Sequence, residues 1–299
     1  MKKFVINLVV FGILVIALDF VCGGLSSSLM SRAKGGSTQN NNFIANRLES
    51  DIVILGSSRA THHYVPSVIT DSTAYSCYNC GEEGNGSILA YGRFKMLTDR
   101  YTPKVVIYEL TPEYDYFFDV DNSKYLKYLK PYYSNNHVKY LIDKFGNDFD
   151  NIKLLSNMYQ NNGLFLTELI DNVVKRDNNE GYSPLKGKLD LKKDLRRERI
   201  VRPIDSRKID LLQEMIADCK AKNICLLFLI SPRYKTVSDA GYFDYAIELA
   251  NKEGIPVYDY SKVSDICDNP TFFNDPLHMN DDGAKYYTQH YVCQIIKNR

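Results

Sequence analysis

The chain has 299 residues, of which 44% are hydrophobic and 24% are charged, a balance that is ordinary for a folded globular protein. Its 37 basic residues nearly cancel its 36 acidic residues, so no overall charge favours binding to nucleic acid. Seven cysteines in a chain of this length are not the disulfide framework of a small secreted domain.

An apolar run from Phe4 to Val21, about long enough for one membrane crossing, follows Lys2 and Lys3 at the N-terminus. The positive-inside rule keeps these lysines in the cytoplasm and sends the rest of the chain outside. We therefore expect residues 1–22 to be an uncleaved transmembrane anchor of the cytoplasmic membrane. The alternatives are a cleaved signal peptide and a lipoprotein with a lipidated Cys22, but neither has the small residues that its cleavage site prefers.

Residues 23–46 are rich in Ser, Gly and Asn and show no apolar periodicity, so we expect a flexible tether there. From residue 47 onward, short aliphatic strands alternate with helical patterns, which predicts an α/β domain over residues 47–299. The alternation favours a three-layer α/β/α architecture with a flavodoxin-like parallel sheet of five strands. We expect the strands at residues 52–55, 74–79, 104–110, 224–230 and 256–260.

Residues 113–205 interrupt this alternation with segments rich in Lys, Tyr and Asn. We interpret them as a helical cap insertion over the carboxyl edge of the sheet, with a disordered excursion as the alternative. Residues 184–203 contain eight Lys or Arg against three Asp or Glu. Such a run is either a solvated face or a surface for anionic lipid or an anionic polymer.

The first strand ends at Gly56-Ser57-Ser58, where the carboxyl end of a parallel strand commonly carries a ligand or a reactive group. Far downstream, Asp275 and His278 lie three residues apart just before the last helix. Acyl transfer needs a hydroxyl, a base and a group that orients the base. Ser58, His278 and Asp275 are therefore a candidate catalytic triad.

Such a site also needs donors for the oxyanion that develops in the reaction. The backbone N–H groups of Ser58 and Gly81 are the candidates, because glycine lets a backbone approach a ligand closely. Arg59 is a further candidate for the substrate-binding rim.

These motifs resemble those of the SGNH, or GDSL-like, hydrolase superfamily, in particular its membrane-anchored acyltransferase and esterase branch. Within that branch the chain is similar to the D-alanyl transfer protein of teichoic acid modification. The resemblance covers about residues 50–299 apart from the insertion. It implies that Ser58 is the nucleophile, that Gly81 is an oxyanion glycine and that Asp275 and His278 complete the triad.

The chain departs from that pattern in two places. Ser57 stands where the family signature has aspartate, and residues 108–113 replace the family's Gly-x-Asn-Asp. The third oxyanion donor is thus unassigned, and Asn79 and Asn85 are the candidates for it or for substrate contact.

Other sites find little support in the sequence. The segment from Asp119 lacks the glycine and the glutamate of a calcium loop, and the glycine-rich residues 81–86 lack the Lys-Ser/Thr of a P-loop. The five histidines have no metal-ligand spacing, so we expect neither a metal nor a cofactor. Cys77 and Cys80 form a Cys-x-x-Cys motif, and we expect a structural role for this pair rather than thiol-disulfide exchange.

The sequence therefore predicts an extracytoplasmic serine esterase or O-acyltransferase, anchored in the membrane and acting on acyl esters of a cell-surface polysaccharide or related polymer. Its expected partners are that glycan, the membrane and a membrane-bound acyltransferase, and no nucleic acid. The alternative is a non-catalytic accessory protein that uses the insertion and the basic residues 186–202 to bind a polymer or a membrane acyltransferase. The missing Gly-x-Asn-Asp favours this alternative, whereas the retained triad opposes it.

Overall fold

The computed structural model describes residues 1–174 and 177–299. The chain forms two compact units, and each is built from two separate stretches of sequence. We call Met1–Arg47 with Asp121–Asn178 the helical unit, and Leu48–Val120 with Asn179–Arg299 the sheet unit.

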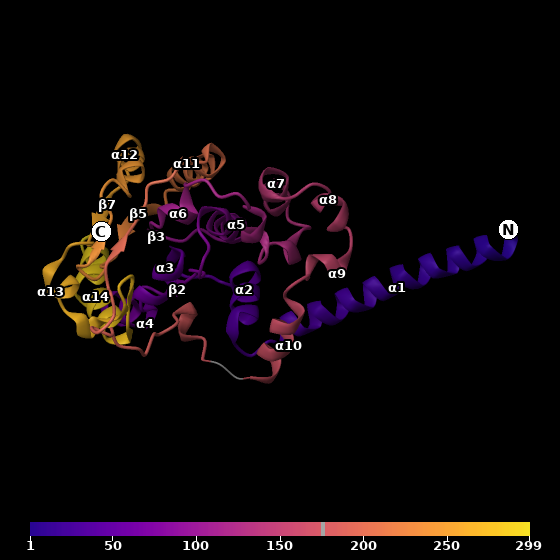
Figure 1. Ribbon diagram of the computed structural model, residues 1–299, viewed down its shortest axis with the longest axis horizontal. Coiled ribbons are helices and arrows are strands. Elements are labelled where there is room, and N and C mark those ends of the chain that lie inside the picture. Colours follow the sequence, from indigo (N-terminus) through magenta and orange to yellow (C-terminus); the bar gives the residue numbers. More distant parts are fainter. Residues whose placement is uncertain (175–176) are drawn as a thin grey trace. The chain divides into compact units, whose positions relative to one another are not determined.

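A parallel five-stranded sheet forms the centre of the sheet unit (Figure 1). Its strands lie in the order β2-β1-β3-β5-β7, and every neighbouring pair is parallel. The strands are β1 Ile52–Gly56, β2 Cys77–Asn79, β3 Val105–Glu109, β5 Cys225–Ile230 and β7 Val257–Asp259. This order confirms the predicted flavodoxin-like sheet, and all five strands lie where the aliphatic runs predict them.

Helices cover both faces of this sheet, so the unit has the predicted three layers. On one face lie α3 Ser58–His63, α4 Pro66–Thr73, α14 Asp281–Tyr287 and α15 Cys293–Lys297, and on the other lie α5 Ser87–Thr98, α11 Ser206–Ala221 and α12 Asp244–Glu253. Alternate side chains of the buried strands point to opposite faces, so β1 sends Ile52 and Ile54 toward α3 and α4. There Tyr64 and Tyr287 meet edge to face, with ring centroids 5.6 Å apart, and join α3 to α14.

Short elements complete the sheet unit at the carboxyl end of the strands and in the connections. They are α6 Pro112–Asp115, η3 Asn179–Gly181, β4 Arg197–Glu198, β6 Val237–Ser238, α13 Ser264–Cys267, η4 Pro270–Phe272, β8 Phe273–Asp275, β9 His278–Met279 and the π-helical turn η5 Thr288–Val292. The antiparallel pair β8–β9 is a tight hairpin that holds the Asp-x-x-His segment.

The helical unit consists of α-helices and short 3₁₀ turns. They are α1 Lys2–Arg32, α2 Gly36–Asn46, η1 Ser123–Leu126, η2 Lys130–Tyr132, α7 Asn136–Phe145, α8 Asp150–Lys153, α9 Asn157–Gln160 and α10 Phe165–Val173. Helix α1 is long and apolar enough to cross a membrane, with a mean hydropathy of 2.7 over its most apolar window, a property that signal sequences share.

The predicted tether, residues 23–46, is helical in the structure. Helix α1 continues to Arg32, and α2 follows after a short turn. The carboxylate of Asp171 accepts a hydrogen bond from the Thr38 N–H at 3.0 Å, and Ile44 and Ala45 are buried. Composition predicts flexibility only for a segment without partners, and this one has partners in residues far along the chain.

The expected insertion, residues 113–205, is divided between the two units. Only Asp121–Asn178 belongs to the helical unit, and the remaining residues pack with the sheet unit. Within the sheet unit, Phe117 bridges to Ile204, so the two ends of the insertion lie together. Its role as a cap stays a prediction.

Candidate active site

The turn after β1 places two serines at the carboxyl edge of the sheet. Gly56 has a φ of +139°, and a Cβ there would lie 2.7 Å from the Glu109 carbonyl oxygen, so the turn requires glycine. Ser57 precedes α3 in an extended conformation and is fully buried, whereas Ser58 is the first residue of α3 and is partly exposed. Ser58, not Ser57, therefore presents its hydroxyl to the site.

The β8–β9 hairpin brings Asp275 and His278 opposite one another. Asp275 Oδ1 accepts hydrogen bonds from the backbone N–H of Leu277 at 2.8 Å and of His278 at 3.0 Å, which closes the turn. The buried Phe273 anchors the hairpin against the Tyr234 ring, with centroids 5.6 Å apart. The carboxylate thus has a structural role in the turn as well as a contact with the imidazole.

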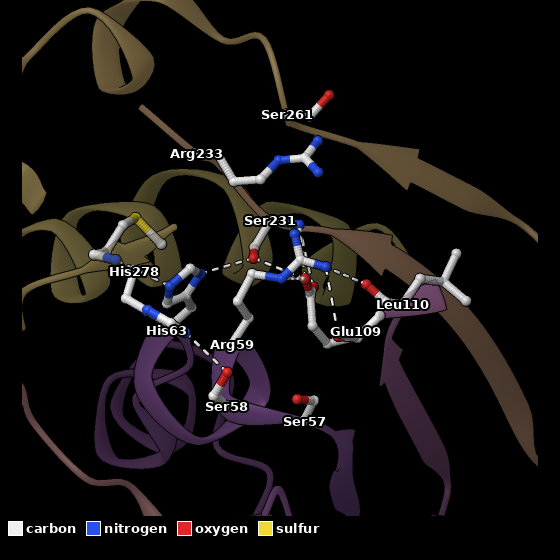
Figure 2. Close-up of polar contacts among 12 residues, drawn as sticks. Ser57, Ser58, Arg59, His63, Glu109, Leu110, Ser231, Arg233, Ser261 and His278 are labelled. Carbon is white, nitrogen blue, oxygen red and sulfur yellow. Dashed lines mark hydrogen bonds and ion pairs between the residues drawn. The ribbon is translucent and has the colours of Figure 1, made fainter. Parts of the chain in front are cut away.

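Ser58, His278 and Asp275 meet in a continuous hydrogen-bonded row. The Ser58 Oγ lies 2.8 Å from the His278 Nε2, and the His278 Nδ1 lies 3.0 Å from the Asp275 Oδ2. Figure 2 marks the contact between Ser58 and His278 with a dashed line. A carboxylate only accepts hydrogen bonds, so Nδ1 carries the proton and Nε2 accepts one from the serine hydroxyl. The predicted triad residues come together in the geometry that serine activation needs.

The charge state of Asp275 suits this arrangement. Burial by itself raises the pKa of this carboxyl, but hydrogen bonds from His278 and Leu277 outweigh it and hold the pKa below its usual value. Asp275 is therefore ionised at neutral pH and accepts the Nδ1–H bond from His278.

The predicted oxyanion donor Gly81 is engaged elsewhere. Its backbone N–H donates to the side-chain Oδ1 of Asn79 at 3.0 Å. A Cβ on Gly81 would lie 2.7 Å from the Thr61 backbone nitrogen and 2.8 Å from the Ala60 Cβ. Glycine is needed here because the loop packs directly on α3, and its amide does not face the site. The Ser58 N–H lies in the first turn of α3, where N–H groups have no carbonyl partner within the helix. Of the two donors considered, it is therefore the one that stays a candidate for binding the oxyanion.

Asn79 and Asn85 also have structural partners. The Asn79 amide group donates to the carbonyl oxygens of Ala60 at 2.7 Å and Tyr64 at 3.1 Å, and the side chain is fully buried. The Asn85 side chain donates to the Glu83 carbonyl oxygen at 2.9 Å within its own loop. Asn79 therefore holds the loop against α3, and a third oxyanion donor at this residue finds no geometric support.

Arg59, a candidate for the rim, instead lies buried beneath the triad, with 2% of its surface exposed. Its Nε contacts Glu109 Oε1 at 3.2 Å, and its Nη2 donates to the Leu110 carbonyl oxygen. The reason is that residues on successive positions of α3 point in different directions, so the residue after Ser58 turns toward the sheet. Arg59 pairs with a strand carboxylate and does not line a substrate surface.

Glu109, the last residue of β3, is the centre of a buried polar network that sequence reasoning missed. It is fully buried and accepts hydrogen bonds from the Tyr64 hydroxyl and from the N–H and hydroxyl of Ser231, the latter at 2.8 Å. Burial raises the pKa of Glu109, an effect that the Arg59 guanidinium opposes. The sequence did carry a signal for this network, because Glu109 is a charged residue at the end of a run of buried strand residues.

The network continues from Ser231 to the hairpin through His63 (Figure 2). The His63 Nδ1 lies 2.7 Å from the Ser231 Oγ, and the Met279 N–H donates to the His63 Nε2 at 3.0 Å. Because Nε2 accepts that bond, Nδ1 carries the proton and donates to Ser231. Met279, the residue next to His278, is thereby linked through His63 and Ser231 to Glu109 and Arg59.

The environment of Cys77 and Cys80 agrees with their expected structural role, and His62 has a partner close by. The His62 Nε2 lies 3.0 Å from the Glu83 Oε1, at the edge of the glycine-rich loop. Both cysteines are free and buried, and burial raises the pKa of the Cys80 thiol to about 12. Raised pKa values disfavour the thiolate that disulfide exchange needs.

A polar cavity of about 230 Å³ lies at the carboxyl ends of β5 and β7. Its lining includes Arg233, Lys235, Asp239 and Ser261, but neither Ser58 nor His278. It is therefore separate from the reactive hydroxyl. Within residues 1–174 and 177–299, no group of three His, Cys, Asp or Glu side chains is placed to hold a metal ion.

Comparisons with known proteins give structural neighbours only. No protein-family model matches the chain. No curated protein matches it either. One similar structure is described as a lipolytic protein of the G-D-S-L family from Desulfitobacterium hafniense, with 11% identity, a TM-score of 0.42, and coverage of 82% of this chain and 99% of that one.

Two further structures are similar. One is described as an acylhydrolase from Bacteroides fragilis, with 13% identity, a TM-score of 0.41, and coverage of 88% of this chain and 96% of that one. The other is a gut microbial diltiazem-metabolizing enzyme, with 12% identity, a TM-score of 0.38, and coverage of 81% and 47%. At these low similarities, we base the function on the side-chain geometry of Ser58, His278 and Asp275.

Proposed function

We propose that this protein is a serine-dependent acyl ester hydrolase or O-acyltransferase of the SGNH type. The observation that carries the proposal is the 2.8 Å contact between Ser58 Oγ and His278 Nε2, with Asp275 on the other side of the imidazole. Ser58 meets Asp275 and His278, which lie more than 200 residues along the chain, in the order that nucleophile activation requires.

The reaction would have two steps. In the first, Ser58 Oγ bonds to the acyl carbonyl carbon while its proton passes to His278 Nε2, and the carbonyl electrons move onto oxygen near the Ser58 N–H. When the tetrahedral intermediate collapses, the ester C–O bond breaks and the leaving alkoxide takes the proton from His278. In the second, water or a sugar hydroxyl gives a proton to His278 Nε2 while its oxygen bonds to the acyl carbon. The bond between that carbon and Ser58 Oγ then breaks, and His278 returns the proton to Ser58 Oγ.

We place this activity outside the cytoplasmic membrane, on acyl esters of a surface polysaccharide or a related polymer. The support for this location is the apolar helix α1 behind Lys2 and Lys3, whose charge favours a cytoplasmic N-terminus. An anchored domain can receive an acyl group from a membrane-bound acyltransferase, which favours transfer over hydrolysis.

A non-catalytic accessory protein is the second candidate, and one observation favours it. The Gly81 N–H donates to the Asn79 side chain, which leaves the Ser58 N–H as the candidate oxyanion donor. Loss of one oxyanion donor costs roughly 10²–10³ in rate. In this alternative, the same fold binds a polymer or a membrane acyltransferase without turnover.

The test is labelling of the full chain in detergent with a fluorophosphonate probe, which reacts with activated serines. We expect wild type to label, Ser58→Ala and His278→Ala not to label, and Ser57→Ala to label like wild type, since Ser57 is buried and does not touch His278. Hydrolysis of a small acetyl ester would follow the same pattern. A folded wild type that neither labels nor hydrolyses the ester would favour the accessory protein.

A further inference from the structure

The helical unit exposes apolar side chains where a water-soluble protein would bury them. In α10 the carboxyl-bearing Glu168 and Asp171 are buried, whereas the opposite face is exposed. That exposed face consists of Phe165, Leu166, Leu169, Ile170 and Val173, with exposed fractions from 40% to 84%. An amphipathic helix in water turns its apolar face inward, so α10 has the reverse arrangement.

The segment before α10 repeats this pattern. Phe149, Ile152, Leu155 and Met158, in and around α8 and α9, are 50–73% exposed. Together with the apolar face of α10 they form what we call the outer apolar surface. Soluble monomers rarely leave so many large apolar side chains of one compact unit in contact with water, so these residues call for a partner.

Contacts with α1 determine the position along this apolar helix at which the outer apolar surface lies. The Asp19 carboxylate of α1 accepts hydrogen bonds from the Ser156 hydroxyl at 2.6 Å and from the N–H groups of Asn157 and Met158 at 2.9 and 3.0 Å. A Cβ on Gly23 would lie 2.4 Å from the Asn157 Cβ, so α9 packs directly on α1. Figure 1 shows α9 and α10 beside the end of α1 that lies farther from the N-terminus.

Asp19 lies at the outer boundary of the apolar part of α1. The run from Phe4 to Val21 spans about 27 Å at 1.5 Å per residue, close to the thickness of the hydrocarbon core. Immediately beyond it, Gly23, Ser27 and Ser31 line a polar cavity of about 350 Å³. The segment that Asp19 binds is therefore at the level where hydrocarbon gives way to lipid head groups.

A further hydrogen bond holds α10 to the same end of α1. The Ser26 hydroxyl donates to the Glu168 carboxylate at 2.5 Å, and Ser26 is about 10 Å beyond Asp19 along the helix. Since Glu168 points inward to this bond, Leu166 and Ile170 face outward on α10.

We propose that the outer apolar surface lies in the head-group and upper acyl-chain region of the lipid bilayer that α1 crosses. The chain would then hold its membrane by α1 and also by residues 149–174, which would rest on the outer leaflet as an interfacial helix does. The occupant is lipid because the surface belongs to the same compact unit as the apolar helix α1, and the Asp19 contacts tie it to the boundary of the hydrocarbon core. The proposal does not depend on the catalytic assignment.

The absence of Trp from the chain allows a direct test. We would introduce single tryptophans as Leu155→Trp and Leu166→Trp in the full chain, reconstituted alone in phosphatidylcholine vesicles. Phe11→Trp in the middle of α1 serves as the buried reference, and Leu191→Trp, 60% exposed in the sheet unit, serves as the matched exposed control. Lipids brominated near the head group or deep in the acyl chain quench tryptophan fluorescence according to depth.

We expect blue-shifted emission at Leu155→Trp and Leu166→Trp, quenched more strongly by lipid brominated near the head group than by lipid brominated deep in the chain. Phe11→Trp should show the opposite preference, and Leu191→Trp should be unquenched. Water-like, unquenched emission at Leu155→Trp and Leu166→Trp would overturn the proposal. Blue-shifted emission without quenching would also overturn it, because a second copy of the chain would then cover the surface. Ser58→Ala in the same variants should leave the quenching unchanged.

Discussion

Asp275 and His278 face one another across the two-residue turn of the β8–β9 hairpin, with the Asp275 Oδ2 3.0 Å from the His278 Nδ1. The same carboxylate accepts the backbone N–H groups of Leu277 and His278, so it shapes the turn that presents the imidazole. One side chain thus determines both the position and the tautomer of the proposed base.

Asp275→Asn should therefore lower turnover far more than it lowers stability. The amide can still accept the two backbone N–H bonds, but its NH₂ group would favour the wrong histidine tautomer. We expect kcat for a small acetyl ester to fall by about two to four orders of magnitude. Asp194→Asn, at an exposed carboxylate far along the chain, should leave kcat unchanged. An Asp275→Asn rate within about twofold of wild type would remove Asp275 from the triad.

Gly81→Ala tests whether the glycine loop positions Ser58 through α3. The added Cβ would lie under 3.0 Å from the backbone nitrogen of Thr61, which cannot move without moving the helix that starts at Ser58. A displacement of about 1 Å at a nucleophile can cost about 10²-fold in rate, and we expect a loss of that order in kcat. Gly84→Ala, in the same loop, adds a Cβ in open space at a φ of +65°, so it is the control for backbone strain in the loop without a clash against α3. Similar kcat values for the two variants would contradict this role.

Periodicity predicted the sheet and its five strands, and strand-end logic selected Ser58, Asp275 and His278, which lie within hydrogen-bond distance of one another. Each of these is local in sequence or follows from a general rule: aliphatic runs give buried strands, and their carboxyl ends meet at one edge. Ser58, Asp275 and His278 could be paired because a hydroxyl, a carboxylate and an imidazole are the groups that acyl transfer needs, even though serine and aspartate are also common in caps and turns.

The roles of Gly81, Asn79 and Arg59 could not be predicted in the same way. Each role depends on the partner that an atom reaches in the folded chain. The Asn79 side chain reaches Ala60 and Tyr64, and Arg59 reaches Glu109. The Gly81 N–H then binds that same Asn79 side chain. The helical state of residues 36–46 likewise depends on Asp171, more than 130 residues along the chain. Composition carries no information on such partners.

Breaking the Arg59–Glu109 pair should destabilise the sheet unit strongly. Both side chains are buried, so Glu109→Gln would leave the Arg59 guanidinium without its counter-charge. We expect a loss of about 3–5 kcal/mol in the free energy of unfolding, measured by denaturant titration with near-UV circular dichroism. Glu253→Gln breaks the surface pair with Lys220 and should have a much smaller effect, because solvent screens that pair.

A small effect of Glu109→Gln, below about 1 kcal/mol, would mean that Glu109 is already neutral in the native protein. Burial raises the pKa of this carboxyl and so favours its neutral form, whereas the Arg59 guanidinium lowers the pKa and favours the carboxylate. The variant therefore decides which of the two effects dominates at this site.

His63 should make the protein less stable as the pH falls. Burial, followed by the nearby His278 and Arg59, holds the pKa of His63 well below its usual 6.5. The unfolded chain therefore binds a proton at His63 below about pH 6.5 that the native protein does not bind. Stability from this group is present above that pH and is lost as the pH falls below it, by up to about 1.4 kcal/mol per pH unit.

The measurement is the free energy of unfolding of wild type and His63→Gln at about pH 7 and about pH 5. Gln can accept the Met279 N–H and donate to Ser231, and it does not titrate. We expect the variant to lose less stability than wild type between the two pH values, because the other titrating groups contribute alike to both proteins. Equal losses for wild type and His63→Gln would show that His63 binds its proton in the native state too, and the hydrogen bond from Met279 would then have to be absent.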